Sequence, residues 1–412
     1  MSPPPDLAGL AVVLTASCNL RCAYCYQNAK RGQAASWETV CAALDLVRGV
    51  RGPDVRLLFT GGEPLLEFDL LRRAVDRLES IRPPGLRVRY ELVTNGTRLG
   101  DPEAGFLAAH GFAVQIGFDG VPAAQDVRAP GTAAVIDALL DRLRRVHPAF
   151  FRQCVSVAVT VTPATVRHLA DSVEHLLARD VAEILIAPAF THQPDWDDAG
   201  LPELRRQFAQ VLRTALARYR ARRDVPLLLF RKGLARPPRP VRPMPMCPVA
   251  DRRHLVVDVD GQVYGCVAFA ESYQRFPTPL LRSRLAPLGL GAVDAPDLAG
   301  RLAAFQAAAR STDLLRAKEE KYSRYGRCGE CRYLATCQVC PVGIGHQPGN
   351  DDPRRVPDFP CAFTRAAMAC RARFPRQPTV ADLARGRVAP PAAVRRLLDA
   401  RGVVRRPAST GR

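Results

Sequence analysis

Lysine is scarce in this sequence of 412 residues. Only Lys30, Lys232, Lys318 and Lys321 occur, so 55 of the 59 positive side chains are arginines, and the formal net charge is +19. The arginines are spread along the chain and never alternate with aromatic residues, as they do in single-strand nucleic-acid binders. With the many Ala, Pro and Leu residues, this is typical of genome-wide codon bias. The charge therefore selects neither RNA nor an acidic peptide as a partner, and a nucleic acid is not favoured.

Long apolar runs are also missing. No stretch approaches the 18 uninterrupted apolar residues that a membrane helix needs, which argues against a membrane partner. No signal peptide is evident, so we expect a cytoplasmic protein whose thiols stay reduced. Under those conditions the 13 cysteines indicate metal binding rather than disulfides. The length suggests two or three domains with a sizeable core.

Three of the cysteines lie within eight residues near the start of the chain. Cys18, Cys22 and Cys25 have the spacing C-x3-C-x2-C, with Tyr24 between the last two. Thiolates are soft ligands that suit iron–sulfur clusters and zinc, and such sites typically need four ligands. Three ligands on a short loop can hold three irons of a cubane and leave the fourth open. The alternatives are a lipoprotein cleavage site, disfavoured by the short apolar run, and a zinc knuckle that borrows a distant fourth ligand.

Strand and helix patterns alternate through the first half of the chain. We expect strands at 9–16, 55–59, 86–93, 113–118, 154–161 and 182–187, and helices at 36–50, 68–78, 166–178 and 201–222. Alternation at roughly 30 residues predicts parallel strands with right-handed crossovers. Ligands of such α/β sheets bind beyond the carboxyl ends of the strands. The cysteine loop, Gly61–Glu63, Thr94–Gly96 and Asp119 all fall at those ends.

The cysteine loop and Gly61-Gly62-Glu63-Pro64 resemble the radical S-adenosylmethionine (SAM) superfamily, with its C-x3-C-x-aromatic-C signature and GGEP element. The resemblance implies an α/β fold, a partial (β/α)6 TIM-like barrel. It also implies a 4Fe–4S cluster whose open iron chelates SAM and cleaves it to a 5′-deoxyadenosyl radical. The cofactor-binding residues that it implies are Tyr24, Gly61, Gly62, Glu63, Thr94, Asn95, Asp119 and Arg128.

One element departs from the family pattern. Family members often have Ser-Leu-Asp-Gly followed by His-Asp-x-x-Arg, whereas this chain has Gly117-Phe-Asp-Gly120 and Gln125-Asp-Val-Arg128. The serine and the histidine are therefore missing. The resemblance would place Asp119 near the SAM ribose and Arg128 near its carboxylate. A surface turn and a salt bridge are the alternatives for these two residues.

A second group of cysteines lies in the C-terminal half. The hairpin-like run Leu255–Tyr264 separates Cys247 from Cys266, and Cys328-x2-Cys331-x5-Cys337-x2-Cys340 comes later, followed by Cys361 and Cys370. This arrangement resembles the SPASM extension of radical SAM enzymes, except that the last spacing there is x3. The resemblance assigns three cysteines to a first auxiliary 4Fe–4S cluster (Cys247, Cys266, Cys340) and four to a second (Cys328, Cys331, Cys337, Cys361). Cys370 is either a spare ligand or a core thiol, and a zinc ribbon is the alternative for the whole group.

These patterns divide the chain into four parts. We expect a radical SAM barrel at 1–230, a Pro/Arg-rich linker at 231–246, a SPASM-like domain at 247–374 and a basic tail at 375–412.

The resemblance implies an oxidoreductase that modifies a peptide or protein. We expect an oxidative crosslink or related change in a ribosomally synthesised peptide, with a flavodoxin or ferredoxin as electron donor. Because only 17 residues precede Cys18, leader-peptide recognition would need a separate protein or the second domain. The alternatives are a sulfatase-maturing type of Ser/Cys oxidase, a small-molecule dehydrogenase or epimerase, and a nucleic-acid-binding iron–sulfur or zinc protein. No acid or base is distinguished by its pattern.

Overall fold

The computed structural model describes most of the barrel and part of the C-terminal half. The described residues are 7–25, 27, 32–50, 52–189, 193, 195–231, 254–272, 289–301, 318–337, 339, 352 and 354–377. The predicted ligands Cys247 and Cys340 lie outside them, as do residues 232–246 of the linker and the tail from 378 onward.

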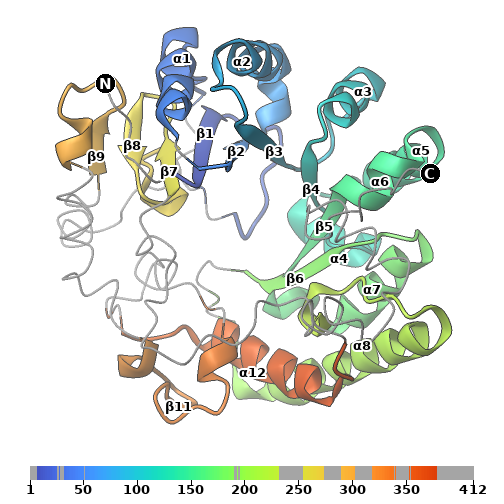
Figure 1. Ribbon diagram of the computed structural model, residues 1–412. Coiled ribbons are helices and arrows are strands. Elements are labelled where there is room, and N and C mark those ends of the chain that lie inside the picture. Colours follow the sequence, from blue (N-terminus) through green and yellow to red (C-terminus); the bar gives the residue numbers. More distant parts are fainter. Residues whose placement is uncertain are drawn as a thin grey trace, which may run out of the picture.

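A curved sheet runs through the middle of the molecule (Figure 1). Within the described ranges its strand order is β6-β5-β4-β3-β2-β1-β7-β8-β9, and β1 to β6 are parallel throughout. The strands are β1 (Gly9–Thr15), β2 (Asp54–Gly61), β3 (Arg87–Thr94), β4 (Ala113–Gly117), β5 (Val155–Val161), β6 (Ile184–Pro188), β7 (His254–Val257), β8 (Gln262–Tyr264) and β9 (Gly289–Ala292). The α/β fold with an open, sequentially ordered parallel barrel is therefore confirmed.

The helices follow the convex side of this sheet (Figure 1). They are α1 (Trp37–Asp45), α2 (Phe68–Ile81), α3 (Asp101–Ala109), α4 (Pro122–Arg128), α5 (Ala133–Val146), α6 (Pro148–Cys154), α7 (Leu169–Ala178), α8 (Leu201–Arg222) and α12 (Asp358–Arg373). Ser36 caps α1 as its sequence predicts, since its hydroxyl accepts from the Thr39 amide at 3.0 Å. That helix ends at Asp45, earlier than the pattern suggests, and a 3-10 turn continues it through Gly49.

The two faces of the strands differ in exposure. On the convex face Val55, Leu57 and Phe59 are completely buried under the helices. On the concave face Leu58 is half-buried and Val93 is 39% exposed. Because side chains alternate between the faces of a strand, the core lies between sheet and helices, and the concave face stays accessible.

The hairpin predicted over Leu255–Tyr264 is confirmed and joins the barrel sheet. Strands β7 and β8 pair antiparallel around a turn at Gly261, whose φ is +80°. Strand β7 also pairs in parallel with β1, from Gly9 opposite His254 to Val12 opposite Val257. The strand that leads into the first cysteine loop is therefore flanked by a strand from the C-terminal half.

Helix α12 packs against α8 through aromatic side chains. Phe363 meets Phe208 edge-on with the ring centroids 5.0 Å apart, and Phe359 meets Trp196 at the same separation. Among the described helices, none is both long and apolar enough to cross a membrane.

Candidate functional site

Cys18, Cys22 and Cys25 lie on the loop that follows β1, and all three are half-buried. A turn closes the loop, with the Cys25 amide 3.1 Å from the Cys22 carbonyl. The Sγ of Cys18 accepts from the Leu20 amide at 3.4 Å and from the side-chain amide of Asn95 at 3.8 Å. None of the described cysteines forms a disulfide. Because the Cys18 sulfur accepts from two N–H donors, as the sulfur of a metal-bound cysteine commonly does, this loop fits an iron–sulfur cluster.

The Gly-Gly-Glu turn after β2 packs directly on the base of the cysteine loop. The Gly62 amide donates to the Thr15 carbonyl at 2.8 Å, and the Glu63 amide donates to the Ser17 carbonyl at 2.9 Å. A Cβ at position 62 would lie 2.0 Å from the Ser17 oxygen, and Gly61 has a φ of +150°. Only glycine fits such close backbone approaches, which explains why both positions lack a side chain.

Glu63 links this turn to the next one. Its carboxylate is completely buried and accepts from the Leu65 amide at 3.0 Å, the Thr94 hydroxyl at 2.7 Å and the Asn95 amide at 2.7 Å. Burial raises the pKa of Glu63, and these three hydrogen bonds oppose the rise. The carboxylate therefore fixes the turn after β3 against the turn after β2.

Two residues that sequence reasoning missed complete the connections. The side chain of Asn19 accepts from the side-chain amide of Asn95 at 3.0 Å and donates to the Thr97 hydroxyl at 2.8 Å. Gln27, also buried, donates to the Gly61 carbonyl at 2.8 Å. Their only signal in the sequence is proximity to the cysteines, because amide side chains are common in loops.

Tyr24 connects the cysteine loop to the end of β4. Its hydroxyl donates to the Asp119 carboxylate, which is 1% exposed. Asp119 also accepts from the Arg128 guanidinium at 3.0 and 3.3 Å and from the Thr160 amide at 2.8 Å. Burial raises the pKa of Tyr24 well above its ordinary value. The structure thus brings Tyr24, Asp119 and Arg128 together in one buried network.

The residues that depart from the family pattern fit this network. A Cβ at Gly117 would lie 2.5 Å from Nη1 of Arg128, so the arginine occupies space that a serine there would take. Gln125, at the position of the missing histidine, accepts from the Asp119 amide at 2.9 Å and donates to the Thr132 hydroxyl at 2.9 Å. Arg128 therefore fills the space of the missing serine side chain, and Gln125 supplies hydrogen bonds at the position of the missing histidine.

Four cysteines of the C-terminal half gather in a second site. Burial and, after it, the nearby Cys361, Cys337 and Cys331 raise the pKa of the Cys328 thiol to about 11. The four cysteines therefore lie close enough to interact electrostatically. Cys361 donates to the Ser323 hydroxyl at 3.2 Å, and Val339 and Val356 pack against three of the cysteines. Four thiols without disulfides fit an iron–sulfur cluster by donor type and number.

Cys370 and Cys266 lie outside this group of four cysteines. Cys370 is 7% exposed and belongs to the main hydrophobic core. It lies nine residues from Cys361 on the same helix, about 13 Å along the axis, so it is not a member of the second group. Cys266 is half-buried after β8, and its predicted partners are outside the described residues. In the part of the chain that the structure describes, no three His, Cys, Asp or Glu side chains are placed to hold a single metal ion.

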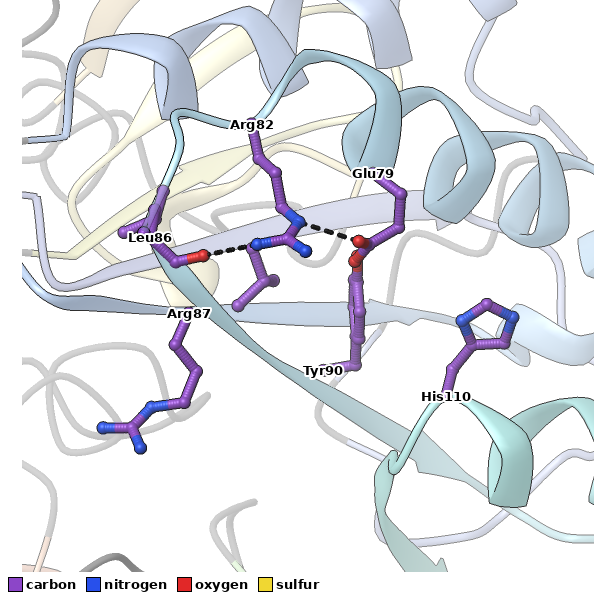
Figure 2. A pocket seen from close by; sticks show the side chains of 8 residues that line it. Glu79, Arg82, Leu86, Arg87, Tyr90 and His110 are labelled. Atoms are coloured by element: carbon purple, nitrogen blue, oxygen red, sulfur yellow. Dashed lines mark hydrogen bonds and ion pairs between the residues drawn. The ribbon is translucent and has the colours of Figure 1, made fainter.

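A polar depression lies at the other end of the sheet (Figure 2). Its volume is about 420 Å³, and it is lined by residues such as Glu79, Arg87 and His110. Figure 2 shows Arg82 bonded to Glu79 at 2.7 Å and to the Leu86 carbonyl at 2.8 Å. The depression is at the start of β3, about 23 Å along the strand from Thr94. It is therefore separate from the cysteine site.

Comparisons with known sequences match the barrel. Residues 12–176 match the family model of the Radical SAM superfamily. An uncharacterised protein of Methanocaldococcus jannaschii is 28% identical over 180 residues, 42% of this chain and 60% of that protein. A serine-type anaerobic sulfatase-maturating enzyme of Klebsiella pneumoniae is 28% identical over 120 residues, 28% of this chain and 30% of that enzyme. The chain thus matches less than two thirds of the length of each of these curated relatives.

Two solved structures have the same overall fold. The enzyme anSMEcpe with bound AdoMet and Kp18Cys peptide has a TM-score of 0.65 at 15% identity, covering 89% of this chain and 97% of that one. SuiB of Streptococcus suis bound to precursor peptide SuiA has a TM-score of 0.53 at 16% identity, covering 88% of this chain and 76% of that one. At these identities the likeness shows the fold alone.

Proposed function

We propose that this chain, whose residues 12–176 are a radical SAM domain, cleaves SAM reductively and abstracts a hydrogen atom from a peptide or protein substrate. The observation that carries the proposal is a pair of hydrogen-bond networks at the carboxyl edge of the sheet that meet on the cysteine loop. Asn95 joins Cys18 to Glu63, and Tyr24 joins the same loop to Asp119. When bound, a 4Fe–4S cluster and SAM would supply the 5′-deoxyadenosyl radical. The protein itself would bind and orient SAM and the substrate and would exclude water from the site.

Cys18, Cys22 and Cys25 are the proposed ligands of that cluster. The amide donors at the Cys18 sulfur lower the cost of its negative charge. The hydrogen bonds from Gly62 and Glu63 to the loop base hold the ligands at a fixed place relative to the sheet. Preorganisation of this kind reduces the reorganisation needed when SAM binds.

The contacts of the turn side chains refine the predicted SAM roles. The Glu63 carboxylate is already engaged by three donors, so we assign the SAM contact of its turn to the backbone of Gly61 and Gly62. Asp119 is likewise engaged by Tyr24, Arg128 and Thr160. We assign Asp119 and Arg128 to positioning the cysteine loop, and a direct contact with the ribose or the carboxylate of SAM stays a prediction.

Auxiliary clusters are proposed in the C-terminal half. Cys328, Cys331, Cys337 and Cys361 would hold the second one, for which the described thiols have the right number and chemistry. Cys266, with Cys247 and Cys340, would hold the first. Such clusters suit a modification that oxidises the substrate, because a substrate radical must give up an electron when a new bond forms.

A peptide is the proposed substrate class. The concave face of the sheet is accessible and presents small residues, among them Ala158 and Ala187, which leave room for an extended chain. Two proteins of the same fold have been solved with peptides bound. We propose an oxidative crosslink or related modification of a ribosomally synthesised peptide, with an external flavodoxin or ferredoxin as electron donor and a separate leader-binding protein.

A second candidate is oxidation of a Ser or Cys side chain in a sulfatase. The relationship to the sulfatase-maturating enzyme of Klebsiella pneumoniae favours it. Incubation with a Cys- or Ser-containing sulfatase peptide, and with a short peptide encoded beside the gene, separates the candidates. On the sulfatase peptide alone, loss of two hydrogens from Ser supports the second, as does loss of two hydrogens from Cys followed by exchange of its sulfur for oxygen from water with release of sulfide.

The central test is anaerobic reconstitution with iron and sulfide, followed by dithionite, SAM and chromatography for 5′-deoxyadenosine. We expect about twelve irons in the wild type and about eight in the Cys18/Cys22/Cys25→Ala triple variant, from three four-iron clusters. The triple variant should form no 5′-deoxyadenosine. Cys41→Ala is the matched control, because Cys41 lies on α1 outside every proposed site, and it should keep all irons. Absence of 5′-deoxyadenosine from the wild type would refute the proposed function.

A further inference from the structure

Lys321 is the most unusual residue beside the second group of cysteines. It is 1% exposed and ranks among the largest completely buried side chains of the described residues. A buried ammonium group is costly unless anions or acceptors compensate it. The position of Lys321 relative to the four thiols therefore decides whether its charge can be balanced by theirs.

The register of a short hairpin fixes that position. Strands β10 (Tyr322–Ser323) and β11 (Gly326–Arg327) pair antiparallel, with Tyr322 opposite Arg327. The Cys328 amide donates to the Lys321 carbonyl at 2.8 Å, so these two residues extend the ladder by one pair. Side chains of directly opposite residues lie on the same face of an antiparallel pair. Lys321 and Cys328 therefore share a face.

Alternation along β10 identifies this face as the one that meets the cysteines. Ser323, two residues after Lys321, is 8% exposed and accepts from the Cys361 thiol at 3.2 Å. Tyr322, between them, is 39% exposed. A second cation is more exposed: Arg365, one turn after Cys361 on α12, has Nη1 4.0 Å from the Cys331 sulfur.

We propose that Lys321 is a positioning residue that compensates the negative charge of the Cys328/Cys331/Cys337/Cys361 site and raises the reduction potential of a 4Fe–4S cluster held there. The inference rests on the auxiliary cluster of the proposed function. Four thiolates give such a site a net negative charge, and one-electron reduction adds another. A buried cation favours the reduced state more than an exposed one, because water screens the latter. Lys321 thereby makes this site the better electron acceptor.

The test is an anaerobic redox titration followed by EPR on reconstituted full-length protein. The Cys328/Cys331/Cys337/Cys361→Ala variant first identifies the signal of this site by its loss. Lys321→Met should lower the midpoint potential by about 59 mV, which corresponds to a tenfold change in the one-electron equilibrium constant. Lys321→Arg, which keeps the charge, should restore it. Arg365→Met should shift the potential in the same direction but less.

The matched control is Arg332→Met. Arg332 is next to Cys331 in sequence, but it is exposed and its guanidinium contacts the Tyr333 ring 4.8 Å away. Its removal takes away the same charge and should leave the potential unchanged. If Lys321→Met does not fold, Lys321→Gln repeats the measurement. A wild-type potential in the folded neutral variant refutes the inference alone, whereas an unchanged iron count in the Cys328/Cys331/Cys337/Cys361→Ala variant refutes the auxiliary cluster itself.

Discussion

At the scale of single residues, Gly117 has no side chain and thereby leaves space for the side chain of Arg128. The Arg128 guanidinium fills the space over Gly117 and holds Asp119, which in turn holds Tyr24 of the cysteine loop. We expect Gly117→Ala to cost about 1–3 kcal/mol of stability, as overpacking does. It should also weaken SAM binding by displacing Arg128. Thermal unfolding and SAM titration of the reconstituted enzyme measure both effects.

Gly105→Ala is the control for that prediction, because a Cβ there meets nothing within 4 Å and the residue lies inside α3. It should be neutral or stabilising. In an Arg128→Ala background, Gly117→Ala should add little further loss, since the clashing group is gone. Equal losses from Gly117→Ala with and without Arg128 would contradict the argument.

Sequence and structure agree best where the pattern is local. The cysteine loop and the Gly-Gly-Glu turn were expected together at the carboxyl edge of the sheet, and Gly62 and Glu63 do donate to Thr15 and Ser17 at the base of that loop. Their roles in binding a cluster and SAM stay predictions. The absent serine and histidine looked like losses, because the compensating contacts of Gly117 and Gln125 form only in the folded chain. Lys321 gave no signal, since its burial depends on a hairpin that two short strands form.

At the scale of elements, α12 connects the second cysteine site to the barrel. It carries Cys361 in its first turn and packs Phe363 against Phe208 of α8. We expect Phe363→Ala to cost about 3–5 kcal/mol, because a large buried ring is replaced by a cavity. Iron at the second auxiliary site should fall by about four per chain while the first cysteine loop keeps its own. Iron counts and EPR of the variant measure this.

The control for α12 is Val135→Ala, which removes an apolar side chain that is 48% exposed on α5. It should change neither stability nor iron content. Loss of iron from the Cys18 loop in Phe363→Ala, with the second site intact, would contradict the assignment of α12.

Element boundaries show where local patterns mislead. The bounds of α8 agree with the periodicity of its sequence. Helix α12 begins at Asp358, two residues before a proline. Pro360 suggests a break there. It is tolerated because it lies in the first turn, where backbone amides have no partner within the helix.

At the scale of the whole molecule, the two halves share one sheet. Strand β7 pairs with β1 although His254 and Gly9 are far apart in sequence, and no local pattern could have predicted that register. The predicted boundary at 231–246 separates the halves along the chain, and the sheet then joins them again. Without β7, the buried Leu10 and Val12 of β1 would lie on an open sheet edge next to the cysteine loop.

This arrangement makes a prediction about a chain that ends at Arg231. Phe230 would lose its stacking partner Phe374, with ring centroids 4.7 Å apart, and β1 would lose its outer neighbour. We expect the truncated chain to aggregate and to hold no stable cluster, as measured by size-exclusion chromatography and iron counts after anaerobic reconstitution. The full chain with all four Cys328-group cysteines changed to Ala is the control, and it should elute as the wild type does and keep about four irons on the first loop. A monomeric truncated chain that bound four irons and cleaved SAM would show that the barrel is independent of its C-terminal strand.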